Sequence, residues 1–452
     1  MRRGALLLLF VASCGSDQSF EYDLYPIQLA RAPIQPGGEA IGGLLAKVNT
    51  PVGVQPLLVD TAFPFNSLGR GGCPAGVSGW TYTGNIDLLD GWNPAAPLRA
   101  SFDDVGLFDI CPGLVGDSSV QPVGVVGGSL LANFSVGFTF PSSASQPALM
   151  SLWPSYPATD DQLAQDGWVS LRFNLRGSAA VAQGNGEASL TLPNSRTVLA
   201  ACAAPRAFAT TDPQETCAKG EVTVKSSGEN LLLALGTGEG PLILGQSAWA
   251  RVANQMGLSP DAGTTGDLYT AYSTDPISAR FVSLPRLALL QGTTDNTWTG
   301  ACAELASARR IEWVLANQTD PPNPAVCFQP CDASGGQALA TRAYLELGGP
   351  LLAAVVSETS AVIGALNGDV PPNAQVDGII GAGTLAGTRL RIDYPAQPQG
   401  RVVADCEDAA SRDTCWTAPS CPSPSLSSNG QTHTCFGQPP PPHGWAPAPV
   451  CP

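Results

Sequence analysis

Short apolar runs bounded by turn-forming residues recur along most of the chain, and long amphipathic helices are rare. The runs are rich in Val, Leu and Ile, and Gly, Pro, Asn and Asp separate them. This alternation is typical of β-strands joined by turns, so the pattern predicts a mostly β protein. One short helix is expected over 247–256, ending near Gly257 because glycine commonly follows the last helical residue.

Two stretches of the chain match each other without a gap, at 124–141 and 378–395. Each reads as a buried strand, a tight glycine turn, a short helix and an alternating strand that ends at proline. Upstream, the turn residues 35–40 resemble 183–188, and both precede strand patterns. Because the two pairs occur in the same order, we infer that the chain contains two related lobes.

The repeat sets the expected domain organisation. Lobe one is predicted at 21–160 and lobe two at 161–402, with an insertion at about 206–345. Residues 403–452 are rich in Cys, Pro, Ser and Thr, so they are expected to form an irregular tail that depends on disulfides.

The first residues of the chain have the pattern of an export signal. Arg2 and Arg3 precede the apolar run 5–12. This run is too short to span a bilayer, since a spanning helix needs roughly 20 residues. The order of a positive segment and a short apolar segment predicts a signal sequence rather than a membrane anchor.

The end of this signal, Val-Ala-Ser-Cys at 11–14, resembles the lipobox of bacterial lipoproteins. The resemblance implies that residues 1–13 are removed, that Cys14 carries the lipid and that 14–20 form a tether. Gly15, rather than Asp, then implies transfer to the outer membrane, on its periplasmic or cell-surface face. The alternative is an ordinary secretory signal in which Cys14 has no role.

Charge and cysteine content narrow the partners and the compartment. The net charge of −15 opposes contact with phosphate backbones, so no nucleic-acid partner is expected. Removing Cys14 from the 13 cysteines leaves 12, an even number that is consistent with as many as six disulfides in an exported protein. The alternative is a set of free buried thiols.

An acidic residue follows a buried strand in lobe one. In Pro-Leu-Leu-Val-Asp-Thr-Ala-Phe-Pro at 56–64, apolar residues run directly into Asp60 and Thr61. The segment resembles the active-site loop of aspartic peptidases, apolar-apolar-Asp-Thr/Ser-Gly, with Ala62 in the place of glycine. The resemblance implies two β-barrel-like lobes that each supply one catalytic Asp, with Asp60 as the first and Thr61 bracing the loop by hydrogen bonding.

The same family has an apolar-apolar-Gly segment in each lobe, which passes behind the catalytic loop. Two segments of this chain fit that pattern, and their residues are Val125, Val126 and Gly127 in lobe one, and Ile379, Ile380 and Gly381 in lobe two. Tyr82, near a Gly turn, resembles the aromatic residue of the family's flap, and its alternative is a strand residue that packs on the sheet.

The second catalytic Asp is absent from the position where it is expected. Matching the lobes through 197–205 places Ala201 opposite Asp60 and marks Ala201 as a degenerate second site.

The Gly-rich stretch 236–240 lacks the Lys of a phosphate-binding loop and is expected to form a hairpin turn.

Other reaction classes find little support in the sequence. The two histidines, His433 and His443, both lie in the tail, which disfavours Ser-His-Asp catalysis and histidine metal sites in the lobes. No Cys-x-x-Cys pair is present, so no zinc site is expected, and no other metal or cofactor is predicted.

Three functions remain open. The first is a catalytically degenerate, membrane-anchored lipoprotein that binds an extended peptide or protein in the cleft between its lobes. The second is an active aspartic endopeptidase that uses Asp60 and a second carboxylate not recognised in the sequence. The third is a structural protein of the cell envelope that acts through its Cys-rich tail.

Overall fold

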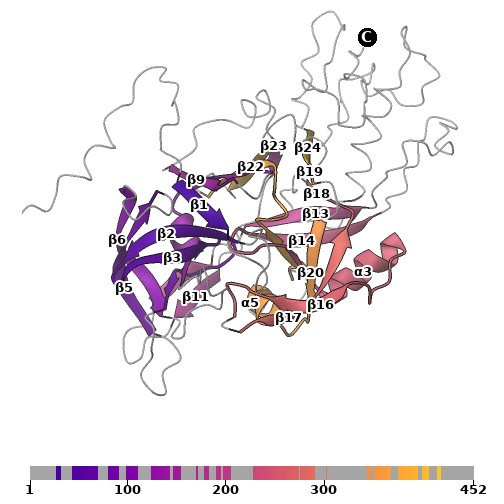
Figure 1. Ribbon diagram of the computed structural model, residues 1–452, viewed down its shortest axis with the longest axis horizontal. Coiled ribbons are helices and arrows are strands. Elements are labelled where there is room, and N and C mark those ends of the chain that lie inside the picture. Colours follow the sequence, from indigo (N-terminus) through magenta and orange to yellow (C-terminus); the bar gives the residue numbers. More distant parts are fainter. Residues whose placement is uncertain are drawn as a thin grey trace, which may run out of the picture.

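The architecture of the chain is given by a computed structural model. The structure describes 27–31, 43–69, 80–90, 98–109, 124–142, 146–153, 169–171, 178–182, 190–194, 197–204, 228–273, 275–290, 302, 344–347, 351–367, 375–394, 400–406 and 415–418. These residues form mainly strands, in two large groups that lie side by side (Figure 1). The mostly β fold predicted from the sequence is confirmed.

The first group is a sheet of twelve described strands that contains lobe one and the junction with lobe two. Its strand order is β10 (Val169–Leu171), β23 (Arg401–Cys406), β22 (Thr388–Asp393), β8 (Ser135–Phe140), β9 (Ala148–Trp153), β1 (Ile27–Arg31), β2 (Leu44–Thr50), β3 (Gly53–Val59), β7 (Gly124–Val126), β4 (Ser67–Leu68), β6 (Leu98–Asp109) and β5 (Trp80–Leu89). An additional pairing of β2 with β5 folds this sheet back on itself.

The second group is a sheet of ten described strands that forms lobe two. Its order is β16 (Thr264–Leu268), β17 (Ile277–Leu284), β20 (Leu351–Val356), β15 (Leu242–Gly245), β21 (Gly378–Gly381), β14 (Glu229–Gly236), β13 (Val198–Ala204), β18 (Arg286–Leu290), β19 (Tyr344–Leu347) and β24 (Cys415–Ala418). The remaining described elements are the hairpin of β11 (Ser178–Ala182) and β12 (Leu190–Asn194), and the helices α1 (Gly128–Leu131), α3 (Gln246–Met256) and α5 (Ala361–Asn367).

The same strand arrangement occurs in both lobes. In lobe one, β3 pairs antiparallel with β2 and parallel with β7. In lobe two, β14 pairs antiparallel with β13 and parallel with β21. The strands β7 and β21 carry the two apolar-apolar-Gly segments, so the repeat recognised in the sequence corresponds to a repeated unit of structure.

The two lobes are joined through the centre of the first sheet. There β8 of lobe one pairs antiparallel with β22 of lobe two, from Ser135 opposite Asp393 to Phe140 opposite Thr388. On either side, β9 extends β8 and β23 extends β22. The buried carboxylate of Asp393 accepts hydrogen bonds from the Ser135 hydroxyl and from Arg401 Nε, the latter at 3.1 Å. Side chains of both lobes therefore satisfy one buried charge at the junction.

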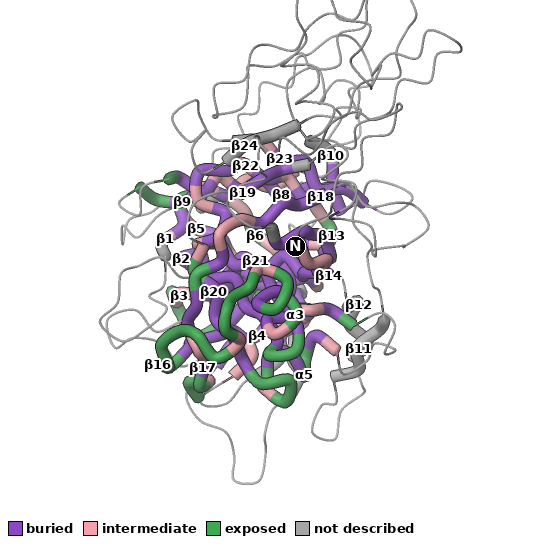
Figure 2. Tube along the Cα trace, turned by 90° about the vertical axis from the view of Figure 1, so that its right-hand side faces the viewer, coloured by how far each residue is buried: buried purple, intermediate pink, exposed green. Residues whose placement is uncertain are grey.

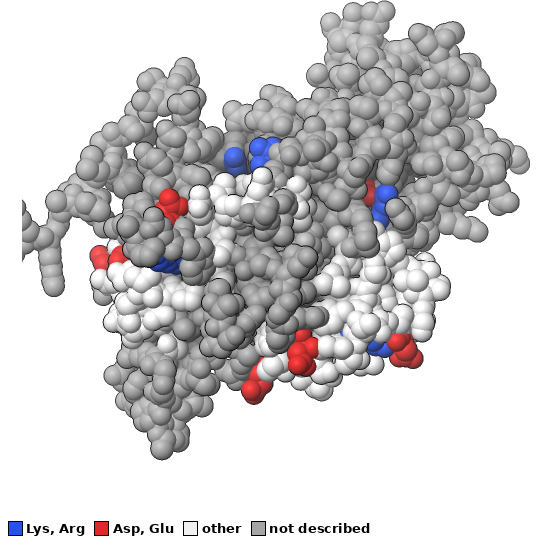
Figure 3. Space-filling model, in the orientation of Figure 1, with Lys and Arg blue, Asp and Glu red and all other residues white. Residues whose placement is uncertain are grey.

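Burial follows the strands (Figure 2). One large apolar cluster extends through both lobes, and exposed positions gather on β16, on the segment between α3 and β16 and on the outer helix faces. On the face shown in Figure 3, few charged side chains interrupt the described surface. The helix α3 agrees with its sequence prediction, and Gly257 caps it with a φ of 66°.

The region expected to be an insertion contributes to the sheet of lobe two. The five strands from β14 to β18 lie within 206–345. Four of them pair directly with β13, β20 or β21, and β16 extends the sheet beyond β17. Within the tail, β24 continues the sheet edge beyond β19. Residues 407–414 and 419–452, with most of the tail's cysteines, lie outside the described residues.

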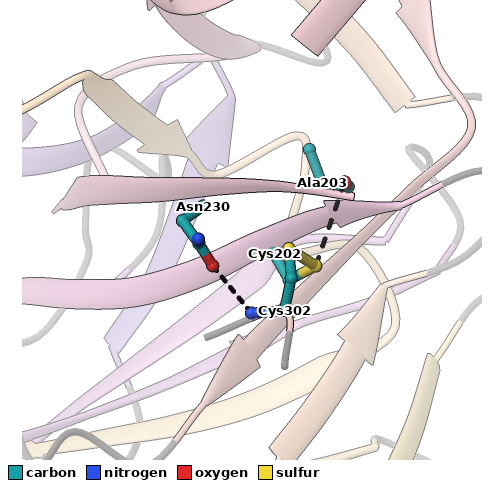
Figure 4. The surroundings of a disulfide bond; sticks show 4 residues. All are labelled: Cys202, Ala203, Asn230 and Cys302. Carbon is teal, nitrogen blue, oxygen red and sulfur yellow. Dashed lines mark hydrogen bonds between the residues drawn. A yellow bond between two sulfur atoms is a disulfide. The ribbon is translucent and has the colours of Figure 1, made fainter. Parts of the chain in front are cut away.

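One disulfide is present among the described residues, between Cys202 and Cys302 (Figure 4). Beside it, the Asn230 side chain accepts a hydrogen bond of 2.7 Å from the Cys302 amide. The bond ties β13 to a residue 100 positions later in the chain. The even number of cysteines had indicated disulfides, and this pair confirms that at least two of them are oxidised partners.

Candidate functional site

Asp60 lies directly after β3, in the loop that turns from lobe one toward lobe two. Its amide donates to the Val126 carbonyl at 3.0 Å, which continues the pairing of β3 with β7. The side chain is fully buried, and its Oδ1 accepts a hydrogen bond of 2.9 Å from the Ala62 amide. The structure therefore places the predicted carboxylate at the end of a buried strand, as the sequence pattern indicated.

A second threonine forms the counterpart of Thr61. The Thr61 hydroxyl donates to the Leu235 carbonyl at 2.5 Å, and the Thr237 hydroxyl donates to the Val59 carbonyl at 2.6 Å. Thr237 Oγ1 also accepts a hydrogen bond of 3.3 Å from the Thr61 amide. The threonine of each loop thus donates to the backbone carbonyl two residues before the threonine of the other loop. This reciprocal bonding makes the two loops equivalent across the lobe interface.

This reciprocal bonding places Gly236 opposite Asp60. Thr61 follows Asp60 just as Thr237 follows Gly236, and both preceding strands pair in parallel with an apolar-apolar-Gly strand. The structure therefore corrects the sequence alignment that placed Ala201 there. Ala201 lies inside β13, between Leu231 and Leu289 of the neighbouring strands.

The stretch 236–240 is not the hairpin that the sequence pattern predicted. It connects β14 to β15, but β21 lies between these two strands and pairs with both. Glycine patterns identify a turn but do not reveal which strand separates its two arms. A signal for the equivalence was present in the sequence, because an apolar run also leads into Gly236 and Thr237.

The surroundings of Gly236 leave little space for a side chain. A Cβ at this position would lie 2.6 Å from Ile379 Cγ2, and 3.3 Å from both Ala62 Cβ and Asp60 Oδ1. The fully buried Ile379 side chain thus fills space next to Asp60. Adding a carboxylate at position 236 would require Ile379 to move.

The two apolar-apolar-Gly segments lie directly behind these loops. A Cβ on Gly127 would be 1.9 Å from the Phe65 carbonyl oxygen, and one on Gly381 would be 2.3 Å from the Pro241 oxygen. Both positions therefore require glycine because the backbones approach closely. The buried side chains of Val125, Val126, Ile379 and Ile380 fill the space on either side of this contact.

The structure adds Glu239 to the site, a residue that the sequence interpretation did not include. Its carbonyl accepts a hydrogen bond of 2.7 Å from the Ala382 amide, as the Phe63 carbonyl does from Gly128. Glu239 is therefore the lobe-two counterpart of Phe63. Its side chain is fully buried, and Oε1 accepts a hydrogen bond of 2.9 Å from the Ala271 amide.

Burial governs the electrostatics of both carboxyls. It raises the pKa of Asp60 from its ordinary 3.8 to about 6, against the opposing effect of the amides of Ala62, Gly238 and Phe63. The pKa of Glu239 is raised well above 4.5, first by burial and then by the negative charge of Asp60. At least one of the two carboxyls therefore holds a proton in mildly acidic solution.

A tyrosine lies near the pair. The pKa of Tyr394 is raised above its ordinary value by burial and by the negative charge of Asp60, and a hydrogen bond with Thr197 opposes this rise. Tyr394 is therefore neutral wherever the carboxyls titrate. It follows β22, so the strand that joins the lobes also contributes a side chain to the surroundings of Asp60.

Two other residues singled out in the sequence have side chains outside the described part of the chain. Tyr82 lies in β5, but its side chain is outside the described residues, as is all of Cys14. Among the residues that the structure describes, no three His, Cys, Asp or Glu side chains gather as a metal site would require. None of the described helices has the length and apolar character needed to cross a membrane.

Comparison with known proteins gives structural similarity alone. No protein-family model matches the sequence, and no curated protein matches it as a relative. Similar solved structures include basic 7S globulin from soybean, at 11% identity and a TM-score of 0.33, over 86% of this chain and 97% of that one. The crystal structure of edgp is 10% identical with a TM-score of 0.36, over 86% and 97%. The aspartic proteinase from Irpex lacteus is 11% identical with a TM-score of 0.34, over 86% and 99%.

The described strands give this chain a mostly β, two-lobed fold in which the lobes share one topology. Two lobes repeat one strand arrangement, join through a shared sheet and bring two threonine-containing loops together at their interface. The two-lobed fold expected from Asp60, Thr61 and the two apolar-apolar-Gly segments is confirmed.

Proposed function

We propose that this protein is a catalytically degenerate member of the aspartic-peptidase-like fold, which binds an extended peptide or protein segment between its two lobes. Gly236 in the place of a second Asp carries this proposal. Peptide hydrolysis on such a scaffold uses two carboxylates that share one proton, so that one acts as base while the other acts as acid. Glycine at that position supplies neither group.

The packing around Gly236 supports the proposal that the second catalytic carboxylate has been lost. Ile379 Cγ2 lies where a side chain on residue 236 would begin. The loops that hold the site together are nevertheless intact, because both threonine hydroxyls still reach across the interface. A scaffold that keeps its two lobes can hold an extended chain as an added strand without reacting with it.

The test is a peptide library incubated with the mature protein at mildly acidic pH, with Asp60→Asn as the matched variant. Mass spectrometry then measures both the peptides retained and the products released. We expect retained, intact peptides and no difference in products between the two proteins. Cleavage by the wild type that disappears in Asp60→Asn would overturn the proposal.

Glu239 supports a second candidate, an acid endopeptidase with a displaced carboxyl pair. Its carboxyl is fully buried, and the negative charge of Asp60 raises its pKa, so the two carboxyls titrate as a coupled pair. In such a reaction the carboxylate takes a proton from a water molecule while the water oxygen adds to the peptide carbonyl carbon. The other carboxyl then protonates the nitrogen as the peptide C–N bond breaks. If this candidate is right, the wild type cleaves peptides in the library assay, and Asp60→Asn and Glu239→Gln each abolish the cleavage. If the binding proposal is right, neither the wild type nor either variant releases products.

We further propose that the protein is exported and anchored to the outer membrane through lipid on Cys14. The support is the sequence of residues 1–15, with its positive start, short apolar run and lipobox-like end. Labelling with a radioactive fatty acid is expected for the wild type and not for Cys14→Ser. Equal labelling of both proteins would contradict the anchor.

A further inference from the structure

A segment of lobe two crosses to lobe one beside the Asp60 site. Residues 269–273 follow β16, and Ala271 is buried in a cluster with Leu45, Leu58 and Val125 of lobe one. The ring of Tyr272 meets the ring of Phe63 edge-on, with centroids 5.3 Å apart. Because Phe63 lies three residues after Asp60, this segment covers the loop that carries the carboxylate.

The segment is held in place by Glu239. The Ala271 amide donates to Glu239 Oε1 at 2.9 Å, and the Tyr272 amide donates to the Thr270 hydroxyl at 3.1 Å. The bond to Glu239 connects the segment to the lobe-two loop that contains Gly236 and Thr237. The bond to Thr270 is internal to the segment. Apolar packing also holds the segment, but of these two hydrogen bonds only the one to Glu239 involves a carboxyl whose charge can change.

That carboxyl has an unfavourable neighbour. Glu239 and Asp60 are both fully buried, and Glu239 Oε2 and Asp60 Oδ2 have no hydrogen-bond partner within the described part of the chain. Among the described residues, the phenol of Tyr394, which follows β22, lies close enough to Asp60 to feel its charge, and its raised pKa keeps it neutral. Tyr272 lies in the segment itself. Two carboxylates in one buried site cannot both carry charge without a large cost in free energy.

We propose that Asp60 and Glu239 form a pH-sensitive latch, in which a proton on either carboxyl keeps segment 269–273 against lobe one and loss of that proton releases it. When both carboxyls are ionised, Glu239 relieves the repulsion by turning toward water, and its bond to the Ala271 amide is lost. Tyr272 then separates from Phe63 and the interface beside Asp60 opens. The consequence for peptide binding rests on the proposed function, but the release itself does not.

The direction of the effect follows from the burial of the pair. Burial raises the pKa of Asp60 to about 6, and burial together with the charge of Asp60 raises the pKa of Glu239 well above 4.5, although the hydrogen bond from the Ala271 amide opposes that rise. The closed form therefore binds protons more tightly than the open form, so low pH favours closure and rising pH favours opening. Once the closed form holds one proton more than the open form, the opening equilibrium rises about tenfold for each pH unit.

Amide hydrogen exchange on the full-length mature protein tests the latch. We expect protection of the Ala271 amide, corrected for intrinsic exchange, to fall about tenfold per pH unit above the titration of the pair. In Glu239→Gln, an uncharged side chain of the same shape, protection is expected to be independent of pH. The Leu44 amide, which donates to the Thr237 carbonyl at 2.8 Å, reports the same interface without the segment.

Two further variants keep the test decisive. Glu358→Gln is the matched control, because the Glu358 carboxylate also accepts a backbone amide, that of Ser247, at a distant exposed position, and this variant is expected to behave as wild type. Asp60→Asn removes the repelling charge, so the pH dependence of Ala271 protection is expected to weaken in this variant. This result tests the latch even if Glu239→Gln does not fold. A wild-type protection that does not change with pH, or one that falls equally in both pair variants, would overturn the latch.

The same proteins separate this inference from the proposed function. Peptide retention measured below and above the titration range is expected to change in the wild type and to stay constant in Glu239→Gln. If exchange follows pH but no peptide is retained at any pH, the latch stands and the binding proposal fails. If peptide is retained while exchange ignores pH, the reverse holds.

Discussion

At the scale of single residues, a buried carboxyl determines how the molecule responds to pH. Folding raises the pKa of Asp60 from 3.8, its ordinary value and the one expected in the unfolded chain, to about 6. The stabilising effect of its proton is complete below the unfolded value and is lost as pH rises through the folded one. The difference corresponds to roughly 3 kcal/mol of unfolding free energy.

Replacing Asp60 by Asn is therefore expected to flatten the stability profile between about pH 4 and 6. Asn keeps an oxygen for the Ala62 amide but takes up no proton. Urea unfolding at a series of pH values measures the effect as the wild-type minus variant difference, which is expected to decline as pH rises. A difference that is constant with pH would show that Asp60 titrates at its ordinary value.

The two threonines hold the loops of both lobes together. Each hydroxyl is buried and donates to a carbonyl of the opposite lobe, so Thr61→Val or Thr237→Val leaves that carbonyl without its donor. A loss of about 1–3 kcal/mol in unfolding free energy is expected for each variant. Thr265→Val on the exposed strand β16 is the control, and an equal loss there would argue against a special role.

At the scale of elements, two glycines with opposite surroundings test the packing. Gly364 lies on the exposed face of α5 with nothing within 4 Å of an added Cβ, whereas Gly236 would bring that atom 2.6 Å from Ile379 Cγ2. Gly364→Ala is expected to stabilise the protein by about 0.5–1 kcal/mol, because alanine is the better helix former. Gly236→Ala is expected to destabilise it by about 1–3 kcal/mol through overpacking.

Thermal unfolding of both variants measures these opposite signs. A second substitution, Ile379→Ala, is expected to remove part of the cost of Gly236→Ala, because it removes the atom that the new Cβ meets. Additive effects of the two changes would mean that the strain lies elsewhere in the loop.

At the scale of the whole molecule, one buried charge connects the lobes. Asp393 of β22 accepts hydrogen bonds from Ser135 of lobe one and from Arg401 of β23. Because the carboxylate and the guanidinium are both buried, Asp393→Asn weakens a buried pair and is expected to cost about 3 kcal/mol. Asp267→Asn on the exposed edge strand β16 is expected to change stability by less than about 0.5 kcal/mol.

Equilibrium unfolding followed by several probes is the measurement for this pair of variants. The wild type is expected to unfold in one transition, since the apolar cluster and the sheet both extend across the junction. Asp393→Asn is expected to lower the midpoint without separating the lobes. A stable wild-type intermediate with one lobe unfolded would contradict this view of the junction.

The sequence by itself determined the features that depend on neighbouring residues. Alternating apolar patterns identified strands, Gly257 marked the end of α3, and the matching segments around Gly127 and Gly381 revealed two related lobes. These features are local because strand faces, caps and close glycine contacts are set by residue type over a few positions. Asp60 was recognised for the same reason, as a carboxylate directly after a buried run.

Only the tertiary structure decided what lies opposite Asp60. The partner is defined by the hydrogen bonds that Thr61 and Thr237, 176 residues apart, make across the lobe interface. A shift of one strand in the alignment was enough to select Ala201 in place of Gly236. Glu239 was overlooked because its importance comes from burial and from the charge of Asp60, not from any pattern around it. The charge states of the two carboxyls depend on solvent exclusion and on their approach through space, and both arise only when the lobes come together.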